Sequence, residues 1–137
     1  MTSSSPMTDR DEIVNLIARV AHLTDEWDTI ADVLSGYTAD CVWDLAGTPA
    51  YHGHAGLATR VQEMLDQKVC GPGIDSRHAV NSVWVTVEGD EATAHSVLLF
   101  CVGTSSPAPQ ISVFRYHDRL RRTAAGWKIA ERKTLLG

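Results

Sequence analysis

The sequence of 137 residues predicts an α+β fold in which three N-terminal helices pack on a strongly curved, mostly antiparallel sheet with a central pocket. Apolar residues recur at helical spacing before residue 70, and long segments rich in β-branched and aromatic residues follow it. No repeat or linker divides the chain. We therefore expect one domain over residues 8–137, preceded by a Ser-rich, disordered tail at residues 1–7.

Three helices are predicted in the first half of the chain. Thr8 is a typical N-cap, and the apolar stripe that follows it predicts a helix that runs to about residue 24. The stripe consists of Ile13, Leu16, Ile17 and Val20. A second, short helix is predicted between Asp28 and Gly36, and the spacing of apolar residues predicts a third helix over about 55–68.

The strands are predicted mainly in the second half. A short strand is expected at CVWDLAG, residues 41–47, and four long strands follow the third helix. The long strands cover about residues 75–87, 91–103, 110–122 and 126–135. They form an antiparallel meander, of which the helices can cover only the concave face. The outer face is therefore free to form a homodimer.

The composition excludes several classes of function. The formal net charge of −5 and the pI of about 5.6 are not those of a nucleic-acid-binding surface. No apolar run reaches the roughly 18 residues that a membrane-spanning helix needs, and the first residues lack the pattern of a signal peptide. We therefore expect a cytoplasmic protein that binds neither nucleic acid nor membrane.

One histidine, His78, lies at the start of a long β-type segment, RHAVNSVWVTV. A neutral imidazole is a suitable general base near pH 7, and a carboxylate on its second nitrogen fixes the tautomer and stabilises the imidazolium. Asp25 and Asp28 are the candidate carboxylates. Continued helical geometry brings Asp28 closer to the apolar face than Asp25, whereas a helix that ends near residue 24 removes that preference. A hydrogen-bonded structural histidine is the alternative.

The order of several motifs resembles the SnoaL-like family of the nuclear-transport-factor-2-like (NTF2-like) superfamily. The motifs are LTDEWD, CVWDL, YHG, RHAVNSVWVTVEGDEATAH and FRYHDRLRRTAAGWKIAER. The family is similar in architecture to ketosteroid isomerase, scytalone dehydratase, bile acid dehydratase, hexachlorocyclohexane dehydrochlorinase and polyketide cyclases. The resemblance implies a cone-shaped fold with a central pocket, and it agrees with the homodimer expected from the free sheet face.

The resemblance also implies a pair of catalytic residues. In the dehydratase and dehydrochlorinase branches an Asp at the end of the first helix orients a His on the first long strand, and Asp25 and His78 match those positions. We therefore prefer Asp25 to Asp28. Trp43 matches an aromatic pocket residue of the dehydrochlorinase branch, whereas no tyrosines match the pair that scytalone dehydratase uses.

Other residues are candidates for the wall and mouth of the pocket. The aromatic candidates are Trp43, Trp84, Phe114 and Tyr116. Arg115 or Arg132 could hold an anionic group of the substrate at the pocket mouth. His52 and His54 form an HxH pattern without a third ligand at a recognisable spacing, so we expect no metal and no other cofactor.

Three functions are consistent with these residues. The first is a cofactor-independent lyase or isomerase that acts on a small, largely apolar molecule through proton abstraction by His78 and an Asp, as dehydratases, dehydrohalogenases and cyclases do. The second is a non-catalytic module that binds a small ligand in the same pocket. The third is a protein-interaction domain that uses the exposed face of the sheet. A pocket-facing His78 in contact with a carboxylate favours the enzyme.

Overall fold

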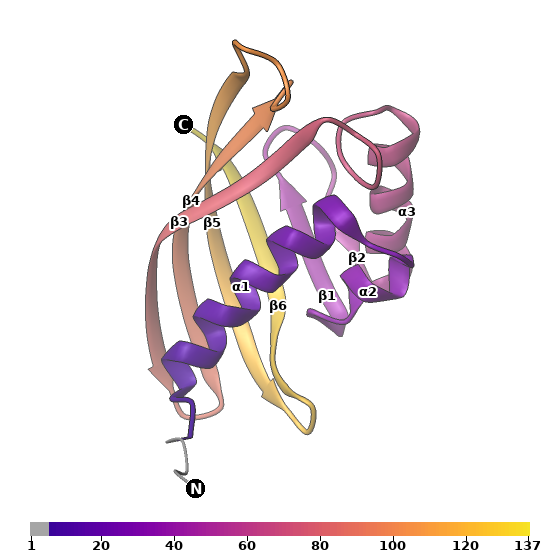
Figure 1. The fold of residues 1–137 in the computed structure, drawn as a ribbon. Coiled ribbons are helices and arrows are strands. Elements are labelled where there is room, and N and C mark those ends of the chain that lie inside the picture. Colours follow the sequence, from indigo (N-terminus) through magenta and orange to yellow (C-terminus); the bar gives the residue numbers. More distant parts are fainter. Residues whose placement is uncertain (1–5) are drawn as a thin grey trace, which may run out of the picture.

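The computed structural model describes residues 6–137, so most of the tail predicted at residues 1–7 lies outside the described residues. The described chain forms three helices and six strands (Figure 1). The helices are α1 (Asp9–Glu26), α2 (Ile30–Leu34) and α3 (Gly53–Asp66). The strands are β1 (Tyr37–Leu45), β2 (Tyr51–His52), β3 (Ser76–Glu88), β4 (Glu91–Val102), β5 (Gln110–Thr123) and β6 (Gly126–Leu136). The predicted α+β class is confirmed.

The strands form one curved, open sheet in the order β2-β1-β6-β5-β4-β3. Neighbouring strands are antiparallel except β1 and β6, which are parallel. Helix α1 crosses the concave face, and α3 packs beside β1 at the other side of the molecule (Figure 1). The core therefore lies between the concave face and the helices. None of the described helices is both long enough and apolar enough to span a membrane.

Helix α1 begins as its sequence predicts and ends slightly later. The Thr8 hydroxyl accepts a hydrogen bond from the backbone N–H of Asp11 at 3.1 Å, as an N-cap does. The predicted apolar stripe is buried, and the helix continues to Glu26 before Trp27 adopts an extended backbone. Asp25 therefore lies in the last helical turn. The helical extrapolation that favoured Asp28 does not apply, because the helix ends before that residue.

Strand β1 is longer than the sequence predicts, since it begins at Tyr37 and not at residue 41. Its first residue pairs with Ile129 of β6, and the pairing continues after a register shift. This partner lies far away in the sequence, so the local pattern YTAD gives no sign of it. As a result, the Tyr37 side chain is buried in the interior.

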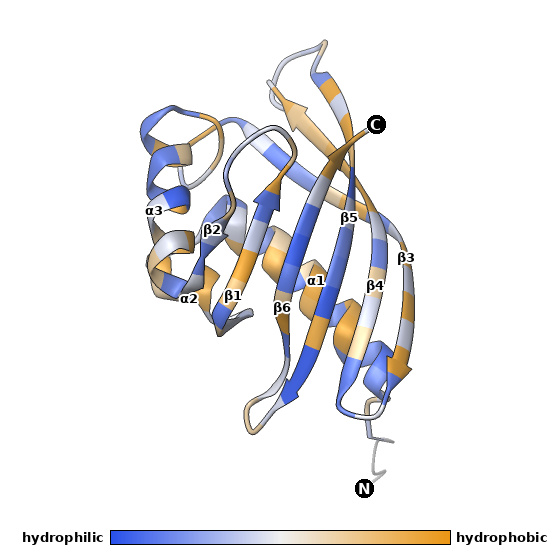
Figure 2. Ribbon diagram, turned by 180° about the vertical axis from the view of Figure 1, so that it is seen from behind, coloured by the Kyte–Doolittle hydropathy of each residue, from blue (hydrophilic) through white to orange (hydrophobic). Residues whose placement is uncertain are grey.

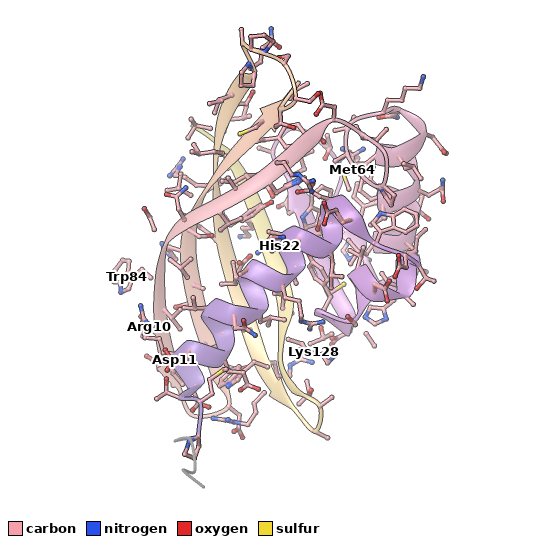
Figure 3. The ribbon with its side chains drawn as sticks, viewed as in Figure 1. Arg10, Asp11, His22, Met64, Trp84 and Lys128 are labelled. Carbon is pink, nitrogen blue, oxygen red and sulfur yellow. The ribbon has the colours of Figure 1, made fainter. Side chains whose placement is uncertain are left out.

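The prediction that Trp84 lines the pocket is wrong. His78 and Trp84 would face the same side of an unbroken strand, because side chains alternate with a period of two. In β3, however, the register shifts between Asn81 and Trp84, and Ser82 has a positive φ of 55°. Such a bulge adds one residue and reverses the faces beyond it. Trp84 is therefore 69% exposed and projects away from α1 (Figure 3).

The convex face of the sheet carries no helix in the described part of the chain, and hydrophobic and hydrophilic residues alternate along its strands (Figure 2). His95 and His117 stack there with their ring centroids 4.2 Å apart. Ile111 and Val113 on β5 are about half exposed. This face therefore offers both apolar and aromatic surface to a partner.

Candidate active site

The last turn of α1 and the start of β3 bring together an aspartate and a histidine that are 53 residues apart in the sequence. Asp25 Oδ1 lies 2.7 Å from His78 Nδ1, and Asp25 Oδ2 accepts the backbone N–H of His78 at 2.8 Å. Both oxygens of the carboxylate are therefore used on one residue. This double contact fixes the position of the β3 backbone and the orientation of the imidazole ring together.

The contacts also determine which ring nitrogen of His78 can react. An ionised carboxylate can only accept hydrogen bonds, so Nδ1 of His78 carries the proton that lies toward Asp25. No described residue forms a hydrogen bond with Nε2, which in this tautomer has a free lone pair. The ring packs against Phe100, with the two ring centroids 4.9 Å apart. His78 is thus held on one side and open on the other.

His78 lies in the wall of a cavity of about 120 Å³ on the concave side of the sheet. Most of the wall is apolar: Trp43, Leu45, Met64, Val69, Leu98, Phe100 and Phe114. The polar or ionisable members are Arg60, Cys70, His78, Tyr116 and Thr134. A smaller void of about 30 Å³ lies deeper and shares four of these residues, His78 among them. Met64 faces the cavity from α3 (Figure 3).

The structure pairs His78 with Asp25 and leaves Asp28 outside the site. Asp28 is exposed, and its backbone N–H donates to the Asp32 carboxylate at 3.1 Å. Of the predicted aromatic residues, Trp43, Phe114 and Tyr116 line the cavity, whereas Trp84 does not.

Neither arginine predicted to hold an anion is available for that role. Arg115 is exposed, and its Nε donates to the backbone carbonyl of Gly137 at 2.7 Å. Arg132 is buried, and its guanidinium forms two hydrogen bonds with the Asp118 carboxylate, at 2.8 and 2.9 Å. The two residues oppose each other across β5 and β6. Sequence alone gave no sign that a carboxylate already occupies the Arg132 fork.

The Tyr116 ring packs against the Arg132–Asp118 pair, with its centroid 3.8 Å from the Arg132 guanidinium carbon. Burial alone would lower the pKa of Arg132, but the adjacent Asp118 charge more than offsets this and the pKa is raised. Burial raises the pKa of Tyr116 above its usual value. Tyr116 therefore stays a neutral phenol in the wall of both cavities.

Nearly the whole sequence matches one known family. Residues 5–133 match the sequence model of the SnoaL-like domain. The chain belongs to the SnoaL-like family. None of the curated proteins matches it.

Solved structures resemble this SnoaL-like protein over nearly its whole length. An NTF2-like protein with a cystatin-like fold from Novosphingobium aromaticivorans is 27% identical, with a TM-score of 0.80 over 93% of this chain and 81% of that chain. A protein from the same bacterium, named as a candidate scytalone dehydratase, is 16% identical, with a TM-score of 0.75 over 94% and 84%. ActVI-ORFA from Streptomyces coelicolor is 20% identical, with a TM-score of 0.76 over 91% and 94%. The expected NTF2-like fold is confirmed.

Among the polar wall residues that were not identified from the sequence are Tyr37 of the deeper void and Arg60 of the larger cavity. Tyr37 reaches the deeper void because β1 begins earlier than expected. Arg60 lies on α3 between the buried residues Leu57 and Val61, at the edge of the apolar stripe. That position was an available signal for a cavity-lining arginine. Another of these residues, Cys70, has a thiol pKa raised by burial to about 12, so it is not a thiolate nucleophile near neutral pH.

The HxH pattern has a structural role at His54, whose ring nitrogen Nε2 lies 2.9 Å from the carbonyl oxygen of Tyr37. His52 is exposed. Within residues 6–137, no group of three or more His, Cys, Asp and Glu side chains is arranged to hold a metal ion.

Proposed function

We propose that this SnoaL-like protein is a cofactor-independent lyase or isomerase that removes a proton from carbon in a small, largely apolar molecule. The reaction is of the dehydratase, dehydrohalogenase or cyclase type. The double contact between Asp25 and His78, in the wall of an apolar cavity, is the observation that carries this proposal.

His78 is the general base in this mechanism. Its Nε2 takes the proton from a substrate C–H bond, and the electron pair of that bond becomes a carbon–carbon double bond or an enolate. The Asp25 carboxylate, at 2.7 Å from Nδ1, stabilises the imidazolium that forms. In an isomerisation the proton then leaves His78 for a second carbon, and in a dehydration it goes to the departing hydroxide. In a dehydrohalogenation the halide departs with the electron pair of its carbon bond and the proton passes to solvent. In a cyclisation the enolate attacks a carbonyl carbon and the proton passes to the alkoxide that forms.

The wall of the cavity supports this chemistry. Apolar residues keep water from the reacting atoms, which strengthens the electrostatic attraction between the imidazolium and the carboxylate. Tyr116 is the group best suited to donate a hydrogen bond to an oxygen on which negative charge develops, because its phenol remains protonated.

The test compares two histidines on opposite faces of the sheet. His78→Ala and His95→Ala are assayed against a panel of small β-hydroxy ketones, β-halo compounds and unsaturated ketones, with product detected by absorbance and mass spectrometry. We expect turnover by wild type and by His95→Ala, and none by His78→Ala, with circular dichroism showing that both variants are folded. Full activity in His78→Ala contradicts the mechanism. Equal ligand binding without turnover in wild type and His78→Ala supports the ligand-binding module instead.

We also propose that the protein forms a homodimer through the convex face of the sheet. Ile111 and Val113 expose apolar surface there, and Trp84 and the His95–His117 stack add aromatic surface. Light scattering should give twice the chain mass of 14.9 kDa, and Ile111→Asp should weaken the assembly. A wild-type monomer at micromolar concentration contradicts this assignment.

A further inference from the structure

Arg60 is the cationic side chain of the larger cavity. It projects from the middle of α3, only 17% of its side chain is exposed, and it shares the cavity wall with Trp43 and His78. Helix α3 and strand β3 therefore contribute a guanidinium and an imidazole to one cavity. The proposed base has a positively charged neighbour that the mechanism above does not use.

The guanidinium of Arg60 donates no hydrogen bond to any described residue. It forms an ion pair with the partly exposed Glu63 carboxylate, but Glu63 Oε2 is 3.7 Å from Nη1, beyond hydrogen-bonding distance, and already accepts the Tyr51 hydroxyl at 3.1 Å. Arg60 Nε is buried without a partner. By contrast, Arg132 and Arg122 each form two hydrogen bonds with one carboxylate. Arg60 thus differs from both in having an unfilled fork.

Two aromatic rings hold this unfilled fork at the cavity. The Arg60 guanidinium carbon lies 5.6 Å from the Trp43 ring centroid and 5.9 Å from the Tyr51 ring centroid. Cation–π contacts of this kind fix the plane of a guanidinium and shield it from water without satisfying its N–H donors. The Arg60 charge also acts inside the cavity, because it lowers the pKa of the Cys70 thiol against the larger effect of burial.

A partly buried guanidinium with unused donors is chemically suited to an anion. Each N–H that is turned away from water is costly unless an acceptor meets it, and a planar carboxylate meets two of them at once. The apolar wall beside Arg60 suits a flat hydrocarbon body attached to that carboxylate. A neutral molecule of the same shape leaves the fork unfilled.

We propose that Arg60 determines the substrate class of this cavity: small, flat monocarboxylic acids, bound with the carboxylate on Arg60 and the hydrocarbon body toward His78. The assignment rests on the proposed function only in that it concerns the same cavity. It corrects the earlier choice of Arg115 or Arg132 as the anion contact. Arg60 binds the substrate, and His78 performs the proton transfer.

The experiment measures binding, so it needs no turnover. Benzoate, cinnamate and 2-naphthoate are titrated into the protein by calorimetry beside their neutral amides, which have nearly the same shape. A charge-assisted hydrogen bond is worth about 10- to 100-fold in affinity, so wild type should prefer each acid by about that factor. Arg60→Met should abolish the preference and leave amide binding within about threefold. Arg60→Lys should retain part of it, because the charge remains without the fork.

Two further variants separate the possible outcomes. Arg115→Met, on the opposite face, should bind the acids as wild type does. His78→Ala should keep the preference for acids, so a failed base mechanism and a failed anion site give different results. Melting temperatures establish that each variant is folded, and Arg60→Lys serves if Arg60→Met does not fold. The assignment is overturned if wild type binds acids no better than amides, if no acid binds at millimolar concentration, or if the preference survives in folded Arg60→Met or is lost in Arg115→Met.

Discussion

Asp25 and Asp118 are two buried carboxylates of the same interior, and each holds a nitrogen base with both of its oxygens. Asp118 binds the guanidinium of Arg132 directly across two neighbouring strands. Asp25 binds the ring and the backbone N–H of His78 between a helix and a strand. The chemistry of the two partners differs more than the geometry of the two carboxylates.

The two pairs differ in whether a nitrogen atom of the base remains free to react. Arg132 keeps its proton at every working pH, and its fork is occupied, so the pair links β5 to β6 and does nothing further. His78 uses Nδ1 for Asp25, its Nε2 has no hydrogen-bond partner among the described residues, and the residue lines a cavity. A buried ion pair near a pocket is therefore a functional candidate only when one atom of it remains free to react.

We call Arg132–Asp118 the closed pair, because its hydrogen-bonding atoms are occupied, and breaking it should have the largest effect. Arg132→Met leaves the Asp118 carboxylate buried without its partner, which costs about 3–5 kcal/mol of unfolding free energy in comparable cases. The double variant Asp118→Leu, Arg132→Met should recover most of this loss, because no charge then remains buried. Urea denaturation of both variants measures the effect. A single-variant loss below about 1 kcal/mol, the size of a surface pair, would mean that the pair is not buried in solution.

We call Asp25–His78 the open pair, because His78 Nε2 has no hydrogen-bond partner among the described residues, and breaking it should act on rate more than on stability. Asn at position 25 can accept the backbone N–H of His78 with its oxygen and turn its NH₂ toward Nδ1, which places the ring proton on Nε2 and removes the base. We expect Asp25→Asn to lower kcat/KM by about 10²- to 10⁴-fold, the usual contribution of a general base. Steady-state kinetics with a substrate from the panel measures this change.

Asp28→Asn is the matched control for the open pair, because Asp28 is exposed and does not contact His78. Its kcat/KM should stay within about twofold of the wild-type value, as expected for a surface site. Equal losses in both variants would contradict the assignment of Asp25 as the orienting carboxylate.

The sequence predicts the open pair better than the closed one, and the reason is physical. Helix α1 and strands β3 to β6 follow from local periodicity, so the positions of Asp25 and His78 could be inferred together with the family resemblance. The contact of Arg132 with Asp118 depends on a register shift between Arg119 and Leu120 in the β5–β6 pairing, which no local pattern specifies.

Two other errors have the same origin. The bulge at Ser82 reverses the faces of β3, and only the pairing with β4 shows it, so Trp84 was placed in the pocket. Arg60 was overlooked because an arginine at the edge of a buried stripe usually extends into solvent. The role proposed for Arg60 depends on its contacts with Trp43 and Tyr51, which lie on strands β1 and β2.

Asp9 and Arg122 form an exposed pair with nearly the same geometry as Arg132–Asp118. Comparing the two pairs separates the effect of burial from that of hydrogen bonding. Asp9 accepts two hydrogen bonds from the Arg122 guanidinium, both at 2.8 Å, and a third from Trp127 Nε1 at 3.1 Å. The Arg122 and Trp127 hydrogen bonds lower the pKa of Asp9 from 3.8 to about 2. Asp9→Asn should therefore cost less unfolding free energy at pH 7 than Arg132→Met, because water screens this pair.

The stabilisation by the Asp9 carboxylate, the smallest of the effects considered, should depend on pH in a defined direction. A carboxyl group whose folded-state pKa is depressed stabilises the fold fully above its unfolded-state pKa, here about 3.8, and this contribution is lost as the pH falls through about 2. The difference in unfolding free energy between wild type and Asp9→Asn should therefore be constant from pH 7 to pH 5 and shrink between pH 4 and pH 2. Urea denaturation of both proteins at these pH values measures the difference. A difference that stays the same down to pH 2 would mean that the Asp9 carboxylate is not held by Arg122 and Trp127 in solution.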